Sequence, residues 1–241
     1  MAQNLTRGIK RGFAGAACTA ALSFLAAAAV WGLALFFCGF YPFGGKSVLI
    51  TDLGQQYIEF HAALYDMVTE KSGLLFTWNA GLGMSFVGLF AYYLASPFTL
   101  LIFLFPRGLI TDAVLAVISA KIAVSGLTFS IYLNRGLRVK GPLNIAFSMM
   151  YALCGYSVIY FFNLMWLDAV ALLPLVILAL RRLITGKSSV PLVAVYALLF
   201  FSNFYTAYMV GVFSALYLIA ALWIEGRAFK ENIMVAAKFL K

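Results

Sequence analysis

The chain has 241 residues, of which 64% are hydrophobic, 17% aromatic and only 10% charged, and its formal net charge is +9. Soluble domains carry about 25% charged residues, so this composition excludes a soluble enzyme, a disulfide scaffold and a disordered tail. The 17 Lys and Arg residues lie in short clusters between apolar runs, which favours membrane loops over a nucleic-acid-binding surface. We therefore expect an all-α polytopic membrane protein in the bilayer, with no nucleic-acid partner.

The first apolar run, residues 13–40, follows the basic residues Arg7, Lys10 and Arg11. The apolar core of a signal peptide has only about 7–15 residues, whereas this run is long enough to span a hydrocarbon core of about 30 Å. It is predicted to be a transmembrane helix with a cytoplasmic N-terminus.

Later apolar runs cover 112–133, 142–162, 167–184 and 190–224. The last would measure about 52 Å as one helix, which is too long for a single crossing. The sequence Ser202-Asn203-Phe204-Tyr205-Thr206 divides it in two. Together with the first run, this predicts about six transmembrane helices in a single domain covering 1–241.

The run 86–105 contains Ser96-Pro97 at its centre, where proline removes a backbone hydrogen bond. If the run crosses the membrane, most of the 17 basic residues fall outside; if it is re-entrant, most are cytoplasmic. The positive-inside rule favours the re-entrant alternative. Residues 41–111 then form a long first outer loop, and the turn 163–168 and the break 202–206 lie on the same outer face.

Within this loop, apolar residues recur at helical spacing and predict an amphipathic helix on the membrane surface: Leu53, Tyr57, Phe60, Leu64 and Met67. Asp52 precedes it. Asp52 with Gln55 fits a capping box, and a carboxylate at this place also suits a general base that faces a cavity. The two interpretations are compatible. His61, one residue beyond Phe60, is expected at the polar edge of the helix.

The segment Trp78-Asn79-Ala80-Gly81-Leu82-Gly83 is aromatic and glycine-rich. It is either an interfacial tryptophan anchor with loop glycines or a surface where a sugar stacks on the ring. The residues alone leave both interpretations open.

Several motifs resemble the bacterial YfhO family, in order and spacing, from about residue 45 to 215. They are Thr51-Asp52-Leu53-Gly54-Gln55-Gln56-Tyr57-Ile58-Glu59-Phe60, Trp78-Asn79 with Gly81-Leu82-Gly83, Tyr92-Tyr93-Leu94-Ala95-Ser96-Pro97-Phe98, Lys121, and Asn163-Leu164-Met165-Trp166-Leu167-Asp168 before Pro174.

The resemblance implies a bacterial cell-membrane glycosyltransferase of the GT-C architecture. Such an enzyme takes a sugar from a polyprenyl-phosphate carrier on the outer face and passes it to a cell-envelope acceptor such as lipoteichoic acid. It also implies a partner enzyme that makes the lipid-linked sugar. Asp52 occupies the place of the catalytic carboxylate, and Gln55, Gln56 and Tyr57 beside it are expected to bind substrate. Family members are usually several times longer, so we expect this chain to be the N-terminal portion of a longer protein.

Two basic residues are candidates for the lipid phosphate. Lys121 is the only basic residue in the middle of an apolar run, where charges are costly and usually functional. The alternatives for Lys121 are an ion pair with another helix or a side chain that reaches the interface. Arg107, which the predicted topology places at the outer surface, is an equally good candidate.

The remaining site candidates are Asp168, Asn203 and Tyr205. Asp168 is either a helix N-cap or a ligand for a sugar hydroxyl or a metal. Asn203 and Tyr205 interrupt a membrane helix, which indicates a polar cavity or a side-chain-stabilised kink. Some GT-C enzymes need a divalent metal and others do not, so a divalent metal is one alternative here. Asp52, Glu59 and Asp168 could supply oxygen ligands, and their spacing leaves this open.

Two other functions are open. A transporter or flippase for lipid-linked sugars would explain broken helices and a charge within the membrane. However, transporters concentrate polar residues near the midplane within repeated halves, and this sequence has no internal repeat. A non-catalytic membrane scaffold would explain the aromatic content but not the polar motifs of the outer loop.

Overall fold

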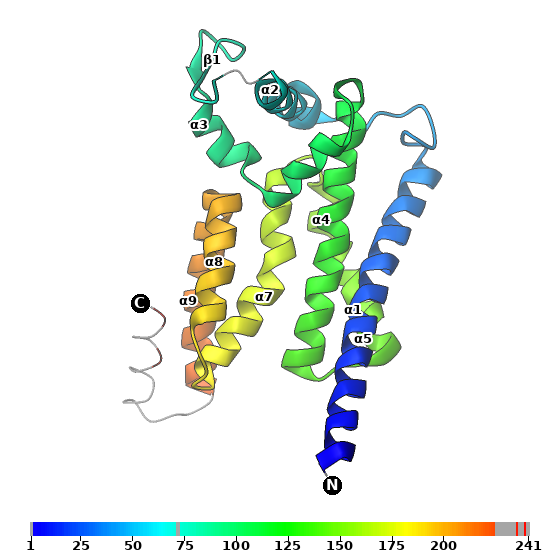
Figure 1. Ribbon diagram of the computed structural model, residues 1–241, viewed down its shortest axis with the longest axis vertical. Helices are drawn as coiled ribbons and strands as arrows, with labels where there is room; N and C mark the ends of the chain where they lie inside the picture. The colour runs from blue at the N-terminus through cyan, green and yellow to red at the C-terminus, as the bar shows by residue number, and fades with distance from the viewer. Residues whose placement is uncertain (1, 71–72, 225–234, 236–238, 240–241) are drawn as a thin grey trace.

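The computed structural model describes residues 2–70, 73–224, 235 and 239, with side-chain surroundings from residue 15 onward. A bundle of helices forms its body (Figure 1). The bundle helices are α1 (Ala2–Cys38), α4 (Ile110–Tyr132), α5 (Gly141–Ala152), α7 (Leu167–Ile184), α8 (Val190–Ser202) and α9 (Phe204–Ile224). Helices α1, α4 and α5 pack together, and α7 joins α4 to the α8–α9 pair.

Residues 41–70 and 73–109 lie across one end of this bundle, which we call the loop face (Figure 1). This segment contains η1 (Leu53–Tyr57), α2 (Ile58–Thr69), β1 (Phe76–Thr77), β2 (Met84–Ser85), α3 (Phe86–Leu89), η2 (Phe90–Leu94), η3 (Pro97–Leu104) and η4 (Arg107–Leu109). The two strands form an antiparallel hairpin in which Phe76 pairs with Ser85 and Thr77 with Met84. Three short elements complete the chain: η5 (Leu133–Leu137), α6 (Gly155–Ile159) and η6 (Leu164–Trp166).

The all-α polytopic class is confirmed. In the described part of the chain, four helical stretches are long and apolar enough to cross a membrane: Gly15–Cys38, Arg107–Leu137, Leu164–Ile184 and Phe204–Ile224. Two of the six expected crossings are shorter. The run 142–162 stops at Ala152 because Cys154 is extended and Gly155 follows, and α8 has only 13 residues.

The segment expected to be re-entrant is sharply bent. Its two arms, Phe86–Leu94 and Pro97–Leu104, meet at 98°. Ser96 causes the break locally, since its hydroxyl accepts a hydrogen bond from the backbone N–H of Phe98 and Pro97 begins the next helix. Both ends of the segment lie at the loop face (Figure 1), as a re-entrant loop requires.

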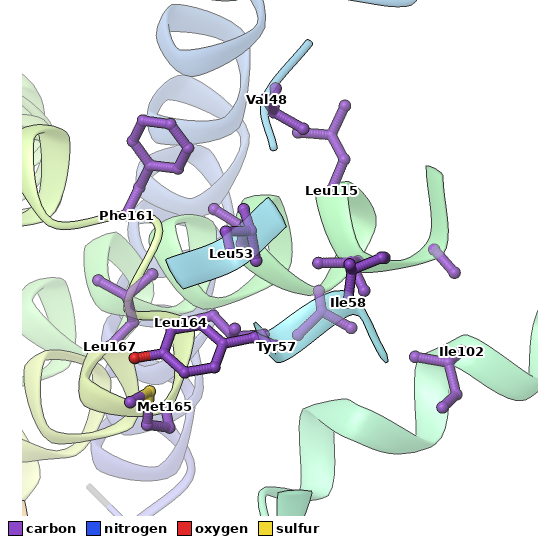
Figure 2. Packing of buried hydrophobic residues seen from close by; sticks show 14 of the residues in the cluster. Val48, Leu53, Tyr57, Ile58, Ile102, Leu115, Phe161, Leu164, Met165 and Leu167 are labelled. Carbon is purple, nitrogen blue, oxygen red and sulfur yellow. The ribbon is translucent and has the colours of Figure 1, made fainter. Parts of the chain in front are cut away.

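The predicted helix is present, but its apolar side packs onto the bundle and not onto a membrane surface. Leu53, Tyr57, Leu64 and Met67 are buried and Phe60 is half-buried. Figure 2 shows Tyr57 beside Leu164, Met165 and Leu167. This contact fixes the helix over the turn before α7.

Candidate functional site

A cavity of about 730 Å³ opens at the loop face between η1–α2 and the β1–β2 hairpin. Its floor is apolar and includes Phe60, Phe86 and Leu89. Its polar lining comes from Gln55, Gln56, Glu59, Asp66, Asn79 and Arg107. The cavity therefore combines amide, carboxylate and guanidinium groups, which hydrogen-bond hydroxyl-rich or phosphorylated ligands.

Arg107 forms a two-bond ion pair with Asp66 in this cavity. Its Nε donates to Oδ1 at 2.6 Å and its Nη2 donates to Oδ2 at 3.0 Å. The hydrogen bond with Asp66 is the main cause that raises the pKa of Arg107, and the nearby Glu59 charge adds to it. Since Asp66 neutralises Arg107, Glu59 leaves the described lining of the cavity with one excess negative charge.

Asp52 stands at the start of η1 with an exposed side chain that makes no capping hydrogen bond. The capping-box interpretation is therefore wrong. Thr51 before it has a positive φ of 46°, an uncommon backbone conformation for a β-branched residue. Asp52 is not among the residues that line the cavity, whereas Gln55 and Gln56, one turn further along, are.

Tyr57 links Asp52 to the interior. Its hydroxyl lies 3.3 Å from Oδ2 of Asp52 and 3.0 Å from Oδ1 of the buried Asn163. Burial, followed by the charge of Asp52, raises the pKa of Tyr57. Tyr57 therefore keeps its proton at neutral pH and acts as a hydrogen-bond donor rather than lining the cavity.

Lys121 and Asp168 form a buried ion pair between α4 and α7, each with a side chain 1% exposed. Nζ of Lys121 donates to Oδ2 of Asp168 at 2.7 Å and to the carbonyl of Leu164 at 2.9 Å. Lys121 thus has the ion-pair role rather than an interfacial one, and it presents no open surface to a lipid phosphate. Asp168 lies in the first turn of α7 behind the N-cap residue Trp166, so the N-cap interpretation is wrong.

Trp78 is 77% exposed and packs edge-on against Phe76 of the hairpin, with ring centroids 4.9 Å apart. Its neighbour Asn79 faces the cavity, but Trp78 does not line it. The hairpin depends on Gly83, whose φ is +99° and where a Cβ would meet the Phe76 ring at 2.6 Å. These contacts fix the shape of the turn without assigning Trp78 to either expected role.

The expected helix break is present between α8 and α9. Asn203 is fully buried, and its Oδ1 accepts a hydrogen bond from the backbone N–H of Thr206 at 2.8 Å, which caps α9. Its Nδ2 donates to the carbonyl of Tyr92 in η2 at 2.8 Å. The kink interpretation therefore accounts for Asn203, while Tyr205 is exposed and lies near the ring of Tyr92.

His61 is fully buried, so its expected place at the polar edge is wrong. The reason is its spacing: His61 follows Tyr57 by four residues and precedes Leu64 by three, on the buried side of α2. Its Nδ1 lies 2.7 Å from the carbonyl of Tyr57, and its Nε2 is buried without a hydrogen-bond partner.

The carboxylates do not converge on a metal site. Among the residues that the structure describes, no three His, Cys, Asp or Glu side chains gather where they would hold a metal ion. Asp168 is held by Lys121 inside the bundle, and Asp52 is near Tyr57. Asp52, Glu59 and Asp168 therefore do not form a metal site together in the described part of the chain.

The sequence did not indicate three polar residues of this region as site candidates: Asp66, Asn163 and Ser96. Asp66 lies seven residues after Glu59 on the same side of α2, so helical spacing was a usable signal. Asn163 and Ser96 stand within motifs of the family resemblance. Their partners, Tyr57 and Asp168, are distant in the sequence, and nothing in the spacing indicated these contacts.

Comparison with known proteins identifies the family. The model of the family described as bacterial membrane protein YfhO matches residues 23–241. The chain belongs to the YfhO family. No curated protein and no solved structure matched the chain significantly. The YfhO match begins within α1 and includes the whole loop face and every residue of the candidate site.

Proposed function

We propose that this YfhO-family protein is a membrane glycosyltransferase of the GT-C type. It moves a sugar from a polyprenyl-phosphate carrier to a cell-envelope acceptor, with lipoteichoic acid as the example implied by the family resemblance. The loop face is the outer face of the membrane, the N-terminus is cytoplasmic, and a partner enzyme supplies the lipid-linked sugar.

One observation carries the proposal. The carboxylate of Asp52 is exposed and free of a capping role at the start of a surface helix, and the next turn of that helix contributes Gln55 and Gln56 to a polar cavity. A helix cap would have used the carboxylate for structure, whereas this one is available to accept a proton. The amides of Gln55, Gln56 and Asn79 suit sugar hydroxyls, which both accept and donate hydrogen bonds.

In the proposed reaction, the hydroxyl oxygen of the acceptor attacks the anomeric carbon of the carried sugar. The bond from that carbon to the phosphate oxygen breaks, polyprenyl phosphate leaves, and Asp52 receives the hydroxyl proton. The attack is in line, so the configuration of the sugar inverts. General-base assistance of this kind typically contributes 10²–10⁴-fold.

The first prediction tests this assignment in cells. Asp52→Asn, expressed at the membrane level of the intact protein, is expected to lower envelope glycosylation at least about 100-fold, because the amide cannot accept the proton. Sugar incorporation into the envelope polymer is the measurement, with a gene deletion as the reference for complete loss.

Glu59→Gln is the matched comparison, since Glu59 is the carboxylate of the cavity that no described ion pair uses. Loss of glycosylation in Glu59→Gln alone would assign the general base to Glu59 instead of Asp52 and would still support a transferase. Full glycosylation in both variants would leave Asp52 and Glu59 without catalytic roles and would put a flippase ahead of a transferase.

A further inference from the structure

A continuous series of polar contacts runs from the exposed Asp52 into the bundle. Tyr57 bridges Asp52 and Asn163, at 3.3 Å and 3.0 Å. The carbonyl of Leu164, the next residue, accepts a hydrogen bond from Nζ of Lys121 at 2.9 Å, and Lys121 forms an ion pair with Asp168 at 2.7 Å. The series joins the loop face, the turn before α7, and helices α4 and α7, and within it only Asp52 is exposed.

The bend of the re-entrant segment is part of the same series. The Ser96 hydroxyl donates a hydrogen bond to Oδ1 of Asp168 at 2.7 Å, while Nζ of Lys121 donates one to Oδ2. Lys121 also lies 5.7 Å from the centroid of the Phe98 ring. The ion pair therefore fixes three separate segments: the bend at Ser96, the turn at Leu164 and the first turn of α7.

Tyr57 has one proton for two acceptors. Oδ1 of Asn163 lies 3.0 Å from the phenol oxygen and Oδ2 of Asp52 lies 3.3 Å from it, so the two acceptors share the phenol proton. Asn163 thereby holds the Tyr57 hydroxyl within hydrogen-bond reach of Asp52.

A buried ion pair is a poor source of stability, because the cost of desolvating both charges offsets most of their attraction. A packed pair of apolar side chains would hold α4 to α7 equally well. It would not hold the Leu164 carbonyl or the Ser96 hydroxyl in place. The charges at Lys121 and Asp168 are therefore better explained by the groups they fix than by the helix contact.

We propose that Tyr57 and Asn163 are positioning residues that orient the Asp52 carboxylate, and that the buried Lys121–Asp168 pair anchors them. The inference rests on the proposed role of Asp52 as general base. None of these four side chains lines the cavity. Other titratable groups near Tyr57 are Tyr92 and Tyr93 of η2 and His61 of α2.

The test is a pair of conservative removals measured in a transfer assay with the purified full chain in lipid nanodiscs. Tyr57→Phe and Asn163→Ala are each expected to lower kcat about tenfold and to leave KM within about twofold. The kcat of the double variant is expected to equal that of the less active single variant, because both residues act through one contact.

Asn144→Ala is the structural control. Asn144 is as fully buried and hydrogen-bonds Ser130, but it lies at the start of α5, away from the loop face. This variant is expected to lose thermal stability while keeping kcat per folded protein. An equal fall in kcat per folded protein in Asn144→Ala and Tyr57→Phe would overturn the positioning role.

Two variants separate this inference from the proposed function. If Asp52→Asn abolishes transfer but Tyr57→Phe keeps the original kcat, the positioning role is wrong and the transferase stands. If Asp52→Asn remains active, both fail together. A nitroxide attached at Gln55→Cys, in a chain whose three native cysteines are replaced, gives a readout that does not depend on activity. Asn163→Ala is expected to raise the mobility of this nitroxide. Unchanged mobility would count against the anchor.

The anchor itself is tested by replacing both charges. Lys121→Met with Asp168→Leu removes the pair without leaving one buried charge, so the fold is expected to survive, whereas either single change is expected to lower the folded yield. In the double variant kcat is expected to fall at least about tenfold. Full transfer by this folded double variant would overturn the anchor.

Discussion

At the scale of single residues, His61 shows how a buried ring is held in one protonation state. Burial, assisted by the positive charge of Lys121, lowers the pKa of His61 to about 4, although the contact with the Tyr57 carbonyl opposes the shift. His61 is therefore neutral in the folded protein at neutral pH. In the unfolded chain its pKa is about 6.5.

This difference predicts a loss of stability in acid. Above about pH 6.5 His61 is neutral in both states, and below it only the unfolded chain takes up the proton. Stability is therefore expected to fall as the pH drops from about 6.5 toward 4, by roughly 2 kcal/mol at pH 5. The measurement is thermal unfolding in detergent at pH 7 and pH 5.

His61→Asn is the comparison, because it keeps a donor near the Nδ1 position and removes the titrating ring. The difference between the two proteins is the relevant quantity, since carboxylates elsewhere contribute a common slope. The same acid slope in His61→Asn as in the original chain would show that His61 is not its source.

The site residues also show what the sequence determines at this scale. Asp52 stands out in the sequence as a candidate because its place before an amphipathic pattern is a local property. Asp168, the partner of Lys121, is 47 positions away, so the buried charge was visible in the sequence while the residue that neutralises it was not. The Tyr57–Asn163 contact, at a separation of 106, was hidden for the same reason.

At the scale of secondary-structure elements, α1 and α4 approach closely at Gly126. A Cβ at this position would lie 3.0 Å from both the Cβ of Ala27 and the carbonyl oxygen of Ser23 in α1. Small residues allow such close contact between membrane helices, where dispersion forces and packing drive association.

Gly126→Leu is therefore expected to push α1 from α4 and to lower the apparent melting temperature by roughly 5 °C. Gly32→Leu in α1 is the matched control, since a Cβ there meets nothing within 4 Å. Thermal unfolding of both variants in the same detergent is the measurement. Equal losses in the two would mean that leucine at either position costs stability for reasons other than helix contact.

Helix existence was easier to predict than helix length. The pattern from Leu53 to Met67 repeats at one spacing over several turns, and the helix appeared where expected with its apolar side buried. The run 142–162 is apolar throughout, so composition alone suggested one crossing. The helix ends at the extended backbone of Cys154, for which Gly155 is a weak local signal inside an apolar run.

At the scale of the whole molecule, the two ends of the bundle differ in character. The turns between α4 and α5 and between α7 and α8 lie at the end opposite the loop face (Figure 1), and they carry Arg135, Arg138, Lys140 and Lys187. This arrangement agrees with the charge argument that made 86–105 re-entrant. The positive-inside rule assigns the basic end to the cytoplasm.

Orientation is tested by cysteine labelling in intact cells, with the three native cysteines replaced by serine. Asn79→Cys in the hairpin is expected to react with a membrane-impermeant maleimide, while Ser188→Cys before α8 is expected to react only after the membrane is permeabilised. Both positions are exposed, so access to the reagent decides the result. Labelling of Ser188→Cys in intact cells would reverse the orientation and move the proposed reaction to the cytoplasmic face.

The short length of α8 affects the membrane around it. Thirteen residues give about 20 Å, and the helix ends where Asn203 binds the Tyr92 carbonyl. Lipids beside α8 meet a hydrophobic surface about 10 Å shorter than the usual hydrocarbon core, and a bilayer relieves such a mismatch by thinning. We therefore expect lipid headgroups to stand deeper beside α8 than beside α9, which has 21 residues.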